Sequence, residues 1–454
     1  MATKRAPFIT KPYSGYYHTE VPEDDKELTR CGPGTPAGEY LRRFWQPVLV
    51  SHQLKELPFA LMRFCEELVA FRDKSGRIGL LQRHCSHCGT SLEFGQIEED
   101  GIRCRPHGWK FAVDGRTLDT PSEPPDSTLK DQHYHGSYPV TEHGGLIFAY
   151  MGPPEKMPDF PTFDLYERPG FHLEPGRHLI PAEEGPLPNF KPCNWLQIVD
   201  NNADPLHEEI IHATISGIQF QDRNGRFVEE VAIPGHGVFI ETPTGIITLD
   251  VRRVTDETVW LRNLEYLWPN MLILGGSHVF PYEWGPDSTE EHAIPLTIFW
   301  AVPVDDHSSV EIDMACVPNG ETFQRAKNNS VAGKSNRGGR DHETMQRFPG
   351  DYEAQTGQRS IAVHGLEHLG VSDRGVIMMR KGIRKRARMV QQGQDPPELE
   401  AQAQRIVPTY AGDTLMRVVR AATPEEDEKM LVRLGMEMGK RYLERPPNLP
   451  YGTR

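Results

Sequence analysis

Short apolar segments separated by turn residues make up the first third of the chain. They are rich in β-branched and aromatic residues, which is typical of β-strands. These segments span residues 45–50, 68–72, 78–82, 138–140 and 146–150. The proline-rich stretch from Pro153 to Pro161 then interrupts regular structure. The pattern predicts an all-β N-terminal domain over residues 31–158, preceded by an N-terminal arm over residues 1–30.

Longer apolar segments follow, and they predict antiparallel strands of one large sheet. These segments span residues 238–241, 246–254, 259–267 and 297–304. A long element is expected at 194–212 and helices at 364–391 and 424–443, whereas the polar, Gly-rich stretch 325–345 is expected to be a mobile loop. The chain is therefore predicted to be α+β, with a second domain over residues 159–454 in which helices flank a large antiparallel sheet.

Composition narrows the class of protein. The 454 residues carry a net charge of -14, which argues against a nucleic-acid partner. No run of about eighteen apolar residues and no signal peptide is found, so we expect a cytoplasmic protein without a membrane segment. The seven cysteines lack the spacing of a disulfide framework. Basic residues between 380 and 388 indicate a solvated helix face or a subunit contact, and alternatively a docking patch for an electron donor.

Residues 85–107 gather metal-binding side chains into two short clips. Cys85 and His87 are separated by one residue, and Cys104 and His107 by two. This order suits a [2Fe–2S] centre in which one iron takes both thiolates and the other takes both imidazoles. Zinc is the alternative, although zinc sites usually pair Cys with Cys and His with His.

The residues around the clips resemble a Rieske domain, in which a His-Gly-Trp corner precedes a strand and a tight turn. The matching positions are His87, Gly89, Ser91, Leu92, Gly95, His107, Gly108, Trp109, Asp114 and Gly115. Two positions depart from the Rieske domains of aromatic oxygenases, because Cys88 stands where Arg is usual and Pro106 where Tyr is common. A missing Tyr hydroxyl is expected to shift the reduction potential. Cys88 is either a loop cysteine that binds nothing or a third thiolate.

A second pair of histidines lies in the element at 194–212. His207 and His212 are five residues apart, which places them about 140° apart on a regular α-helix, too far round to share an ion. We therefore predict a π-bulge or a helix break between them.

The run Asp204-Pro205-Leu206-His207, followed by His212, resembles the Asp-x-x-His-x₄-His motif of Rieske non-heme iron oxygenases. The resemblance covers about residues 30–395 and is to the alpha subunit of the phthalate-dioxygenase-like and aromatic acid O-demethylase branch. It implies a Rieske [2Fe–2S] domain before a catalytic domain of helix-grip, START-like fold. It also implies that His207 and His212 bind a mononuclear Fe(II) ion together with a carboxylate.

The resemblance further implies that the third iron ligand comes from the C-terminal part of the chain. Residues 351–357, with 367–373 after them, are similar to the acidic segment of that branch. Asp351 is the expected ligand, with Glu353 and Asp373 as alternatives. Asn201 or Asn202 is expected either beside the iron or as a solvated loop amide.

The resemblance implies that Asp204 is not an iron ligand but a bridge between the two metal centres. In the family this aspartate joins the cluster of one subunit to the iron of the next, so it would connect His107 to His207 and requires a trimer or stacked trimers. Two electrons would come from NADH through a separate reductase, possibly with a ferredoxin. Because no Gly-rich dinucleotide fingerprint follows a strand, NADH is not expected to bind this chain.

The function implied is that of a terminal oxygenase that hydroxylates or O-demethylates an aromatic carboxylic acid with O₂, for example a lignin-derived methoxy acid. One alternative is a cis-dihydroxylating phthalate-type dioxygenase, and another is a Rieske electron-transfer or redox-sensing protein with an inactive mononuclear site. A carboxylate substrate needs a cation, and Arg252, Arg253 and Arg262 are candidates, although each is expected to be a surface arginine rather than an anchor. Strand alternation places Arg252 and Arg253 on opposite faces.

Overall fold

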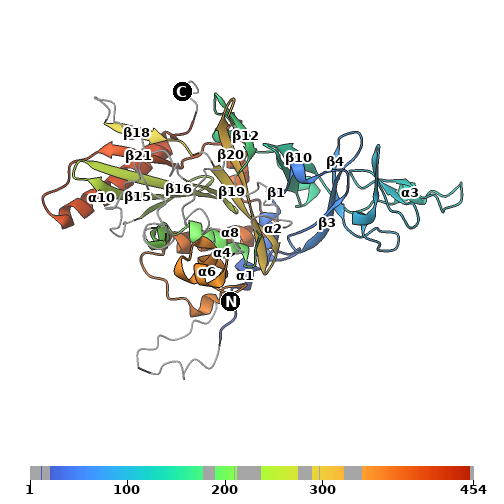
Figure 1. Cartoon of the computed structure of the whole chain (residues 1–454), viewed down its shortest axis with the longest axis horizontal. Helices are drawn as coiled ribbons and strands as arrows, with labels where there is room; N and C mark the ends of the chain where they lie inside the picture. Colours follow the sequence, from blue (N-terminus) through green and yellow to red (C-terminus); the bar gives the residue numbers. More distant parts are fainter. Residues whose placement is uncertain are drawn as a thin grey trace.

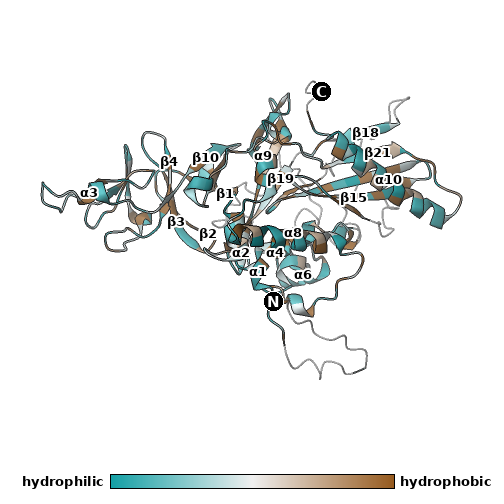
Figure 2. Cartoon of the chain, turned by 180° about the vertical axis from the view of Figure 1, so that it is seen from behind, coloured by the Kyte–Doolittle hydropathy of each residue, from teal (hydrophilic) through white to brown (hydrophobic). Residues whose placement is uncertain are grey.

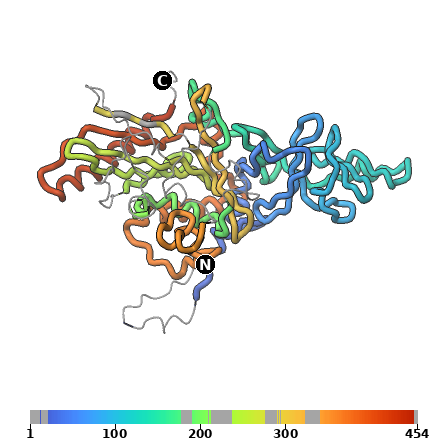
Figure 3. The backbone as a smooth tube through the Cα atoms, in the orientation of Figure 1, coloured from blue at the N-terminus to red at the C-terminus, as the bar shows by residue number. Residues whose placement is uncertain are grey.

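The computed structural model of the chain describes Pro12 and residues 21–176, 190–208, 210–211, 237–274, 289–295, 297–321 and 340–449. These residues form two lobes, one built from the N-terminal strands and one from the large sheet and its helices, as Figure 1 and the backbone tube of Figure 3 show.

The N-terminal lobe is all-β, as predicted. Its strands are β1 (Trp45–Val50), β2 (Phe59–Arg63), β3 (Glu66–Arg72), β4 (Ile78–Gln82), β5 (Gln96–Glu98), β6 (Gly101–Arg103), β7 (Lys110–Phe111), β8 (Thr117–Asp119), β9 (Ser137–Tyr138), β10 (Val140–His143) and β11 (Leu146–Tyr150). They pair into three small sheets of order β1-β11-β10, β2-β3-β4-β9 and β5-β6-β7-β8, antiparallel throughout. The single strand expected at 138–140 is divided, because Pro139 between β9 and β10 has no N–H to donate to a ladder.

The second lobe contains the predicted large antiparallel sheet. Its described strands are β12 (Phe171–Pro175), β13 (Phe190–Lys191), β14 (Val238–Glu241), β15 (Gly245–Thr255), β16 (Thr258–Leu267), β17 (Met271–Ile273), β18 (Glu290–Ala293), β19 (Thr297–Asp305), β20 (Ser308–Pro318) and β21 (Gly412–Arg417). The main path runs β12-β20-β19-β17-β16-β15-β14, and β21 pairs with β16 and β18. The strands predicted for this sheet are confirmed.

The helices lie mainly in the second lobe. The described α-helices are α1 (Lys26–Thr29), α2 (Pro36–Leu41), α3 (Leu129–Gln132), α4 (Trp195–Asn202), α6 (His342–Arg347), α7 (Asp351–Thr356), α8 (Arg374–Gln391), α9 (Pro397–Gln402) and α10 (Pro424–Glu444). Short 3₁₀ turns are η2 (Ser51–Gln53), η3 (Leu92–Phe94), η4 (Pro154–Lys156), η5 (Asp164–Glu167) and η9 (His364–Leu366). No helix among the described residues is both long and apolar enough to span a membrane.

The two faces of the large sheet are covered by different helices because side chains alternate along each strand. Ile247 and Leu249 of β15 pack with Met438 of α10. Ile246, which points the other way, belongs to the larger core that includes Met379 of α8. Figure 1 shows α10 apart from the group formed by α4, α6 and α8, and Figure 2 shows α8 alternating between hydrophilic and hydrophobic stretches.

Two predicted segments need correction. The helix expected at 364–391 begins only at Arg374, because His364–Leu366 forms a 3₁₀ turn and the Asp373 carboxylate accepts the Gly370 N–H (2.6 Å) in the bend before α8. The loop expected at 325–345 overlaps helix α6, whose first turn is capped by the Asp341 side chain on the Thr344 N–H (2.9 Å). Residues 322–339 lie outside the described residues.

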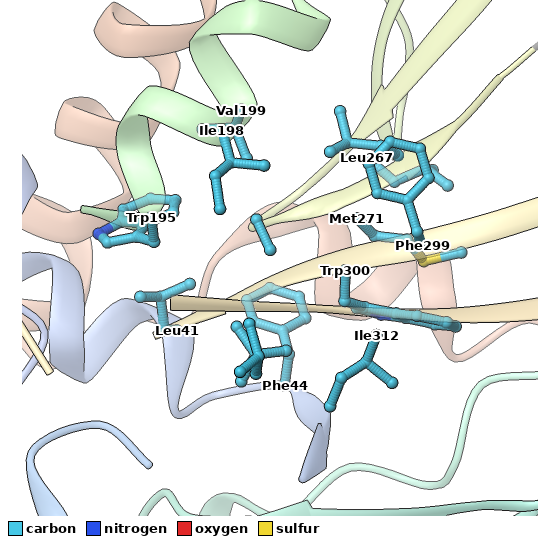
Figure 4. Packing of buried hydrophobic residues seen from close by; sticks show 14 of the residues in the cluster. Leu41, Phe44, Trp195, Ile198, Val199, Leu267, Met271, Phe299, Trp300 and Ile312 are labelled. Carbon is cyan, nitrogen blue, oxygen red and sulfur yellow. The ribbon is translucent and has the colours of Figure 1, made fainter. Parts of the chain in front are cut away.

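One core cluster joins the two lobes. Phe44 from the segment before β1 packs with Trp300 of β19 and with Trp195 and Ile198 of α4 in one cluster of buried residues (Figure 4). Trp195 is fully buried, and burial of such an aromatic side chain contributes about 3 kcal/mol to the free energy of folding. The packing therefore fixes α4 against the sheet, and α4 leads directly into the second histidine pair.

Candidate metal centres

The two clips are built as matched turns. In the first, the Gly89 N–H donates to the Cys85 carbonyl (2.8 Å), and in the second the Gly108 N–H donates to the Cys104 carbonyl (2.9 Å). Both glycines have positive φ, +80° and +74°, a conformation that costs glycine little. The turns begin where β4 and β6 end, so the sheets carry both clips to the same end of the lobe.

The four predicted cluster ligands divide into an inner and an outer pair. Cys85 and Cys104 are each 2% exposed and pack beside Trp109, whereas His87 and His107 are exposed. The two imidazole rings lie edge to face with centroids 4.6 Å apart. Burial, followed by the neighbouring Cys85 thiol, raises the pKa of Cys104 to about 12. Paired buried sulfurs behind paired imidazoles are the donor set that a Rieske [2Fe–2S] cluster requires.

Cys88 lies beside the two cluster histidines. Its Sγ is 3.5 Å from Nδ1 of His107, and it forms a group with His87 and His107 within metal-binding reach. Its side chain is exposed. A role for Cys88 as a third thiolate stays a prediction.

Arg103 clamps the second clip, a contact that the sequence did not reveal. It donates to the Gly108 carbonyl (2.6 Å), to Asp119 (2.8 Å) and to Glu98 (2.7 Å). The Arg103 hydrogen bonds, with further help from Lys110, lower the pKa of Glu98 to about 2. This ion-pair group ties β5, β6 and β8 around the loop that carries Cys104 and His107.

The element at 194–212 is interrupted, as predicted. The Asn194 side chain caps α4 by accepting the Leu196 N–H (3.1 Å), and α4 ends at Asn202. A break at Pro205 follows, and the backbone at residues 208 and 210–211 is π-helical. The expected departure from regular α-helix after His207 is therefore confirmed. His212 lies outside the described residues.

Three side chains converge beyond α4. Nε2 of His207 lies 3.4 Å from Oδ1 of Asp351 and 3.2 Å from Nδ2 of Asn201, and Asn201 also reaches Oδ1 of Asp351 (3.3 Å). Burial acts to lower the pKa of His207, but the Asp351 carboxylate outweighs it and raises the pKa to about 9. Imidazole and carboxylate facing each other suit a divalent cation such as Fe(II).

The alternatives to Asp351 are engaged elsewhere. Glu353 accepts the Gly350 N–H (2.9 Å) and pairs with Arg340 (2.5 Å), which holds the first turn of α7. Asp373 accepts the Gly370 N–H before α8. Of the three candidate carboxylates, Asp351 is the one that faces His207 in the described structure. Its role as a ligand stays a prediction.

Asp204 contacts His207 through its backbone. The Asp204 carbonyl accepts the Nδ1–H of His207 (2.5 Å), whereas its carboxylate lies 3.9 Å from Nδ1. One carboxylate oxygen accepts the Leu206 N–H (2.9 Å). The carbonyl therefore fixes the tautomer and directs Nε2 toward Asp351. Burial raises the pKa of Asp204. The bridging role of the carboxylate stays a prediction.

The expectation that Arg252, Arg253 and Arg262 are surface residues is wrong, because all three are buried and paired with carboxylates. Arg253 binds Asp427 of α10 (3.1 and 2.6 Å). On the opposite face, Arg252 and Arg262 both contact Glu208 (3.5 and 2.7 Å), the residue after His207. The expected division of Arg252 and Arg253 between the two faces is confirmed.

Arg380, Arg384 and Arg388 of α8 make intramolecular ion pairs. Arg380 binds Asp200 of α4 (2.9 and 2.6 Å) and Glu367 (2.6 and 3.0 Å). Arg384 and Arg388 pair with acidic residues of the N-terminal segment, including Glu27. These side chains hold α4 and the N-terminal segment on α8.

Comparison with known proteins places both centres in context. Residues 44–139 match the Rieske [2Fe-2S] domain. The chain is 38% identical over 440 residues to the tert-butanol monooxygenase / tert-amyl alcohol desaturase oxygenase subunit of Aquincola tertiaricarbonis (92% of this chain, 89% of that protein). It is 38% identical over 401 residues to the phenoxybenzoate dioxygenase subunit alpha of Ectopseudomonas oleovorans (87% and 92%). It is 31% identical over 387 residues to the 5,5'-dehydrodivanillate O-demethylase oxygenase subunit of Sphingobium sp. (82% and 82%).

Solved structures agree in fold. The Pseudomonas putida CBB5 NdmA QL mutant with caffeine aligns with a TM-score of 0.58 at 17% identity, covering 85% of this chain and all of that one. Dicamba monooxygenase bound to 3,6 dichlorosalicylic acid aligns with a TM-score of 0.56 at 14% identity, covering 78% and 99%. A Rieske lobe followed by a helix-flanked antiparallel sheet is the architecture they share with this chain.

Proposed function

The chain belongs to the Rieske non-heme iron oxygenases as an alpha subunit, and we propose that it hydroxylates or O-demethylates an aromatic carboxylic acid with O₂. Electrons come from a separate NADH-dependent reductase, directly or through a ferredoxin. The observation that carries this proposal is the convergence of Asn201, His207 and Asp351 beside the π-helical turn, in a chain whose other lobe presents the Cys and His clips.

Each site residue has a separate task. When bound, the cluster supplies single electrons and the ferrous ion supplies O₂ activation. His207 keeps its Nδ1 proton on the Asp204 carbonyl, so Nε2, which faces Asp351, is the nitrogen that would bind the ion in place of its own proton. Asp351 supplies the carboxylate from the first turn of α7, and Asn201 positions both by donating toward Oδ1 of Asp351. His212 completes the proposed ligand set.

Electron delivery is proposed to run between subunits. Figure 1 shows the strands that carry the clips, near β4 and α3, at one end of the molecule and α4 in the other lobe. His107 is exposed, and the Asp204 carboxylate is 30% exposed. We therefore propose a homotrimer, alone or stacked, in which His107 of one subunit meets Asp204 of the next. We propose that the boundary between the two domains follows residue 158.

The substrate class rests on the relatives. Two of them are named for phenoxybenzoate and dehydrodivanillate, which are aromatic acids with an ether or methoxy group. Cis-dihydroxylation is the alternative outcome, because the phthalate 4,5-dioxygenase oxygenase subunit of Pseudomonas putida is 34% identical over 43% of this chain. We place the enzyme in the cytoplasm, in the breakdown of aromatic compounds.

A tertiary alcohol is a second candidate substrate. The tert-butanol monooxygenase relative matches 92% of this chain. In addition, Arg252 and Arg262, the buried candidates for holding a substrate carboxylate, both contact the Glu208 carboxylate. A neutral substrate needs no such cation.

Oxygen consumption with product identification tests the proposal. Purified protein with a reductase is assayed against phenoxybenzoate, methoxylated aromatic acids, phthalate and tert-butanol. Formaldehyde release indicates O-demethylation, a cis-diol indicates dihydroxylation, and substrate-dependent O₂ uptake with tert-butanol alone selects the second candidate. Reduction of the cluster without O₂ uptake on any substrate would favour an electron-transfer or redox-sensing protein.

A further inference from the structure

Three segments far apart in the sequence bring together two thiols and a carboxylate that belong to neither of the proposed iron centres. Cys31 lies between α1 and α2, Cys65 lies in the turn between β2 and β3, and Asp306 lies in the turn between β19 and β20. The two Sγ atoms are 3.7 Å apart, and Oδ1 of Asp306 lies 3.4 Å from the Cys31 sulfur and 3.6 Å from the Cys65 sulfur.

These three distances match the edges of a tetrahedral zinc site. With Zn–S near 2.3 Å and Zn–O near 2.0 Å, tetrahedral angles require sulfurs about 3.8 Å apart and sulfur–oxygen separations of about 3.5 Å. A disulfide would need the sulfurs at about 2.05 Å and would give the carboxylate no role. The carboxylate is nearly equidistant from both sulfurs, and this arrangement favours a shared cation.

Cys65 is presented by the two-residue hairpin turn between β2 and β3. Phe64 and Cys65 have φ of +53° and +62°, in the left-handed region that bulky residues rarely adopt. The turn is held there because the Phe64 N–H donates to the Pro303 carbonyl (3.1 Å) and the Cys65 N–H to the Val304 carbonyl (3.0 Å) of β19. Two-residue hairpin loops favour φ > 0 at both central residues, so the pairing of Arg63 with Glu66 and these two bonds together hold Cys65 beside Cys31.

The charges around the cluster favour a divalent ion. Two thiolates and one carboxylate carry three negative charges, of which a zinc ion neutralises two. Arg30 is shared between two carboxylates, because its Nε lies 3.6 Å from Oδ2 of Asp306 and its Nη2 lies 3.1 Å from Oδ1 of Asp24. The Cys31 N–H also donates to Oδ1 (2.9 Å) and turns that oxygen toward the thiols. Cys65 is exposed, which leaves a fourth position open to water.

We propose that Cys31, Cys65 and Asp306 bind a Zn²⁺ ion with water as the fourth ligand. The ion joins the N-terminal segment, the β2–β3 turn of the Rieske lobe and the β19–β20 turn of the large sheet. It takes no part in the transfer of electrons and does not depend on the identity of the substrate.

Zinc analysis of the whole protein tests this site. Protein equilibrated with Zn²⁺ and desalted is measured for zinc content and by X-ray absorption at the zinc edge, which iron does not obscure. The expected result is one zinc per chain with two sulfur neighbours at about 2.3 Å. Zinc bound in the mononuclear iron site would instead show only nitrogen and oxygen neighbours, and zinc in the clips of Cys85 and Cys104 would show two sulfurs only with loss of the cluster spectrum.

Variants identify the ligands. Cys65→Ser and Asp306→Asn are expected to lose that zinc while the cluster spectrum is unchanged. Cys316→Ser is the matched control, because it removes a thiol from β20 but keeps a donor for the Leu165 carbonyl that Cys316 Sγ contacts at 3.1 Å. Three results overturn the proposal: no zinc with sulfur neighbours in the wild-type protein, full zinc in both ligand variants, or a Cys31–Cys65 disulfide found by peptide mass spectrometry.

Discussion

Replacing Asp200 with Asn tests how α4 is held for the iron site. Asp200 precedes Asn201, and its carboxylate forms a two-pronged pair with Arg380 of α8 (2.9 and 2.6 Å). The side chains of Asp200 and Arg380 are only 10% and 13% exposed. Asp200→Asn keeps the size of the side chain but removes its charge and turns one acceptor into a donor that faces the guanidinium.

The expected loss of folding free energy depends on the ion pairs that Arg380 keeps after the substitution. Breaking a buried pair costs about 3–5 kcal/mol when the partner is left uncompensated. Here Arg380 keeps Glu367 (2.6 and 3.0 Å), so the loss is close to one charge-assisted hydrogen bond, about 2 kcal/mol. For a domain of this size that lowers Tm by about 4–8 °C. Because Asn201 moves with α4, iron at the mononuclear site also falls.

Thermal unfolding and iron content measure the effect, and a double-mutant cycle isolates the pair. Asp200→Asn combined with Arg380→Met should cost less than the two single changes together, by about 1–2 kcal/mol. Arg388→Met, which removes an α8 arginine that is 53% exposed, is the control and should leave Tm close to that of the wild-type protein. An Asp200→Asn protein with wild-type Tm and full iron would refute the reasoning.

Three further changes test other parts of the molecule. Asp204→Asn should abolish product formation while metal content and the cluster spectrum stay intact, and coupled turnover in that variant would rule out the proposed bridge. Glu98→Gln should lower stability by about 1 kcal/mol at pH 7, because the Arg103 hydrogen bonds lower the pKa of Glu98 to about 2. That stability is present above pH 4.5 and is lost as the pH falls toward 2, so the gap between the two proteins should close over this range; a gap that is constant with pH would contradict the assignment. Gly382→Ala would bring a Cβ to 2.2 Å from Cη2 of Trp268 and should cost about 1–3 kcal/mol, and an unchanged Tm would show that α8 can move away from Trp268.

The strands and the clips could be predicted because their signals are local. Side-chain alternation and β-branched residues mark β15, β16 and β19, and Cys85, His87, Cys104 and His107 lie within one hairpin region. Helix boundaries are harder to predict from sequence. The bend in which Asp373 accepts the Gly370 N–H before α8 depends on a side-chain contact that the sequence pattern does not show. Asp341 is a typical N-cap residue for α6, but it lies in a polar, Gly-rich stretch that favours a loop prediction.

The second centre depends on contacts that spacing does not show. Its departure from α-helix after His207 followed from helix geometry, whereas the choice of Asp351 came from resemblance to a family. The sequence does not decide whether Asn201 lies beside the iron, because an asparagine before a turn is as often exposed to solvent as it is part of a site. The Asp200–Arg380 pair and the contact of Arg262 with Glu208 join residues distant in sequence, so only the folded chain brings them together.

Iron content tests the central claim most directly. The wild-type chain, reconstituted with ferrous iron, should hold about three irons, two in the cluster and one at the mononuclear site. Asp351→Ala should hold about two, with an unchanged Rieske spectrum and no product. A wild-type chain that binds only the two cluster irons, or an Asp351→Ala chain that keeps the third, would contradict the account.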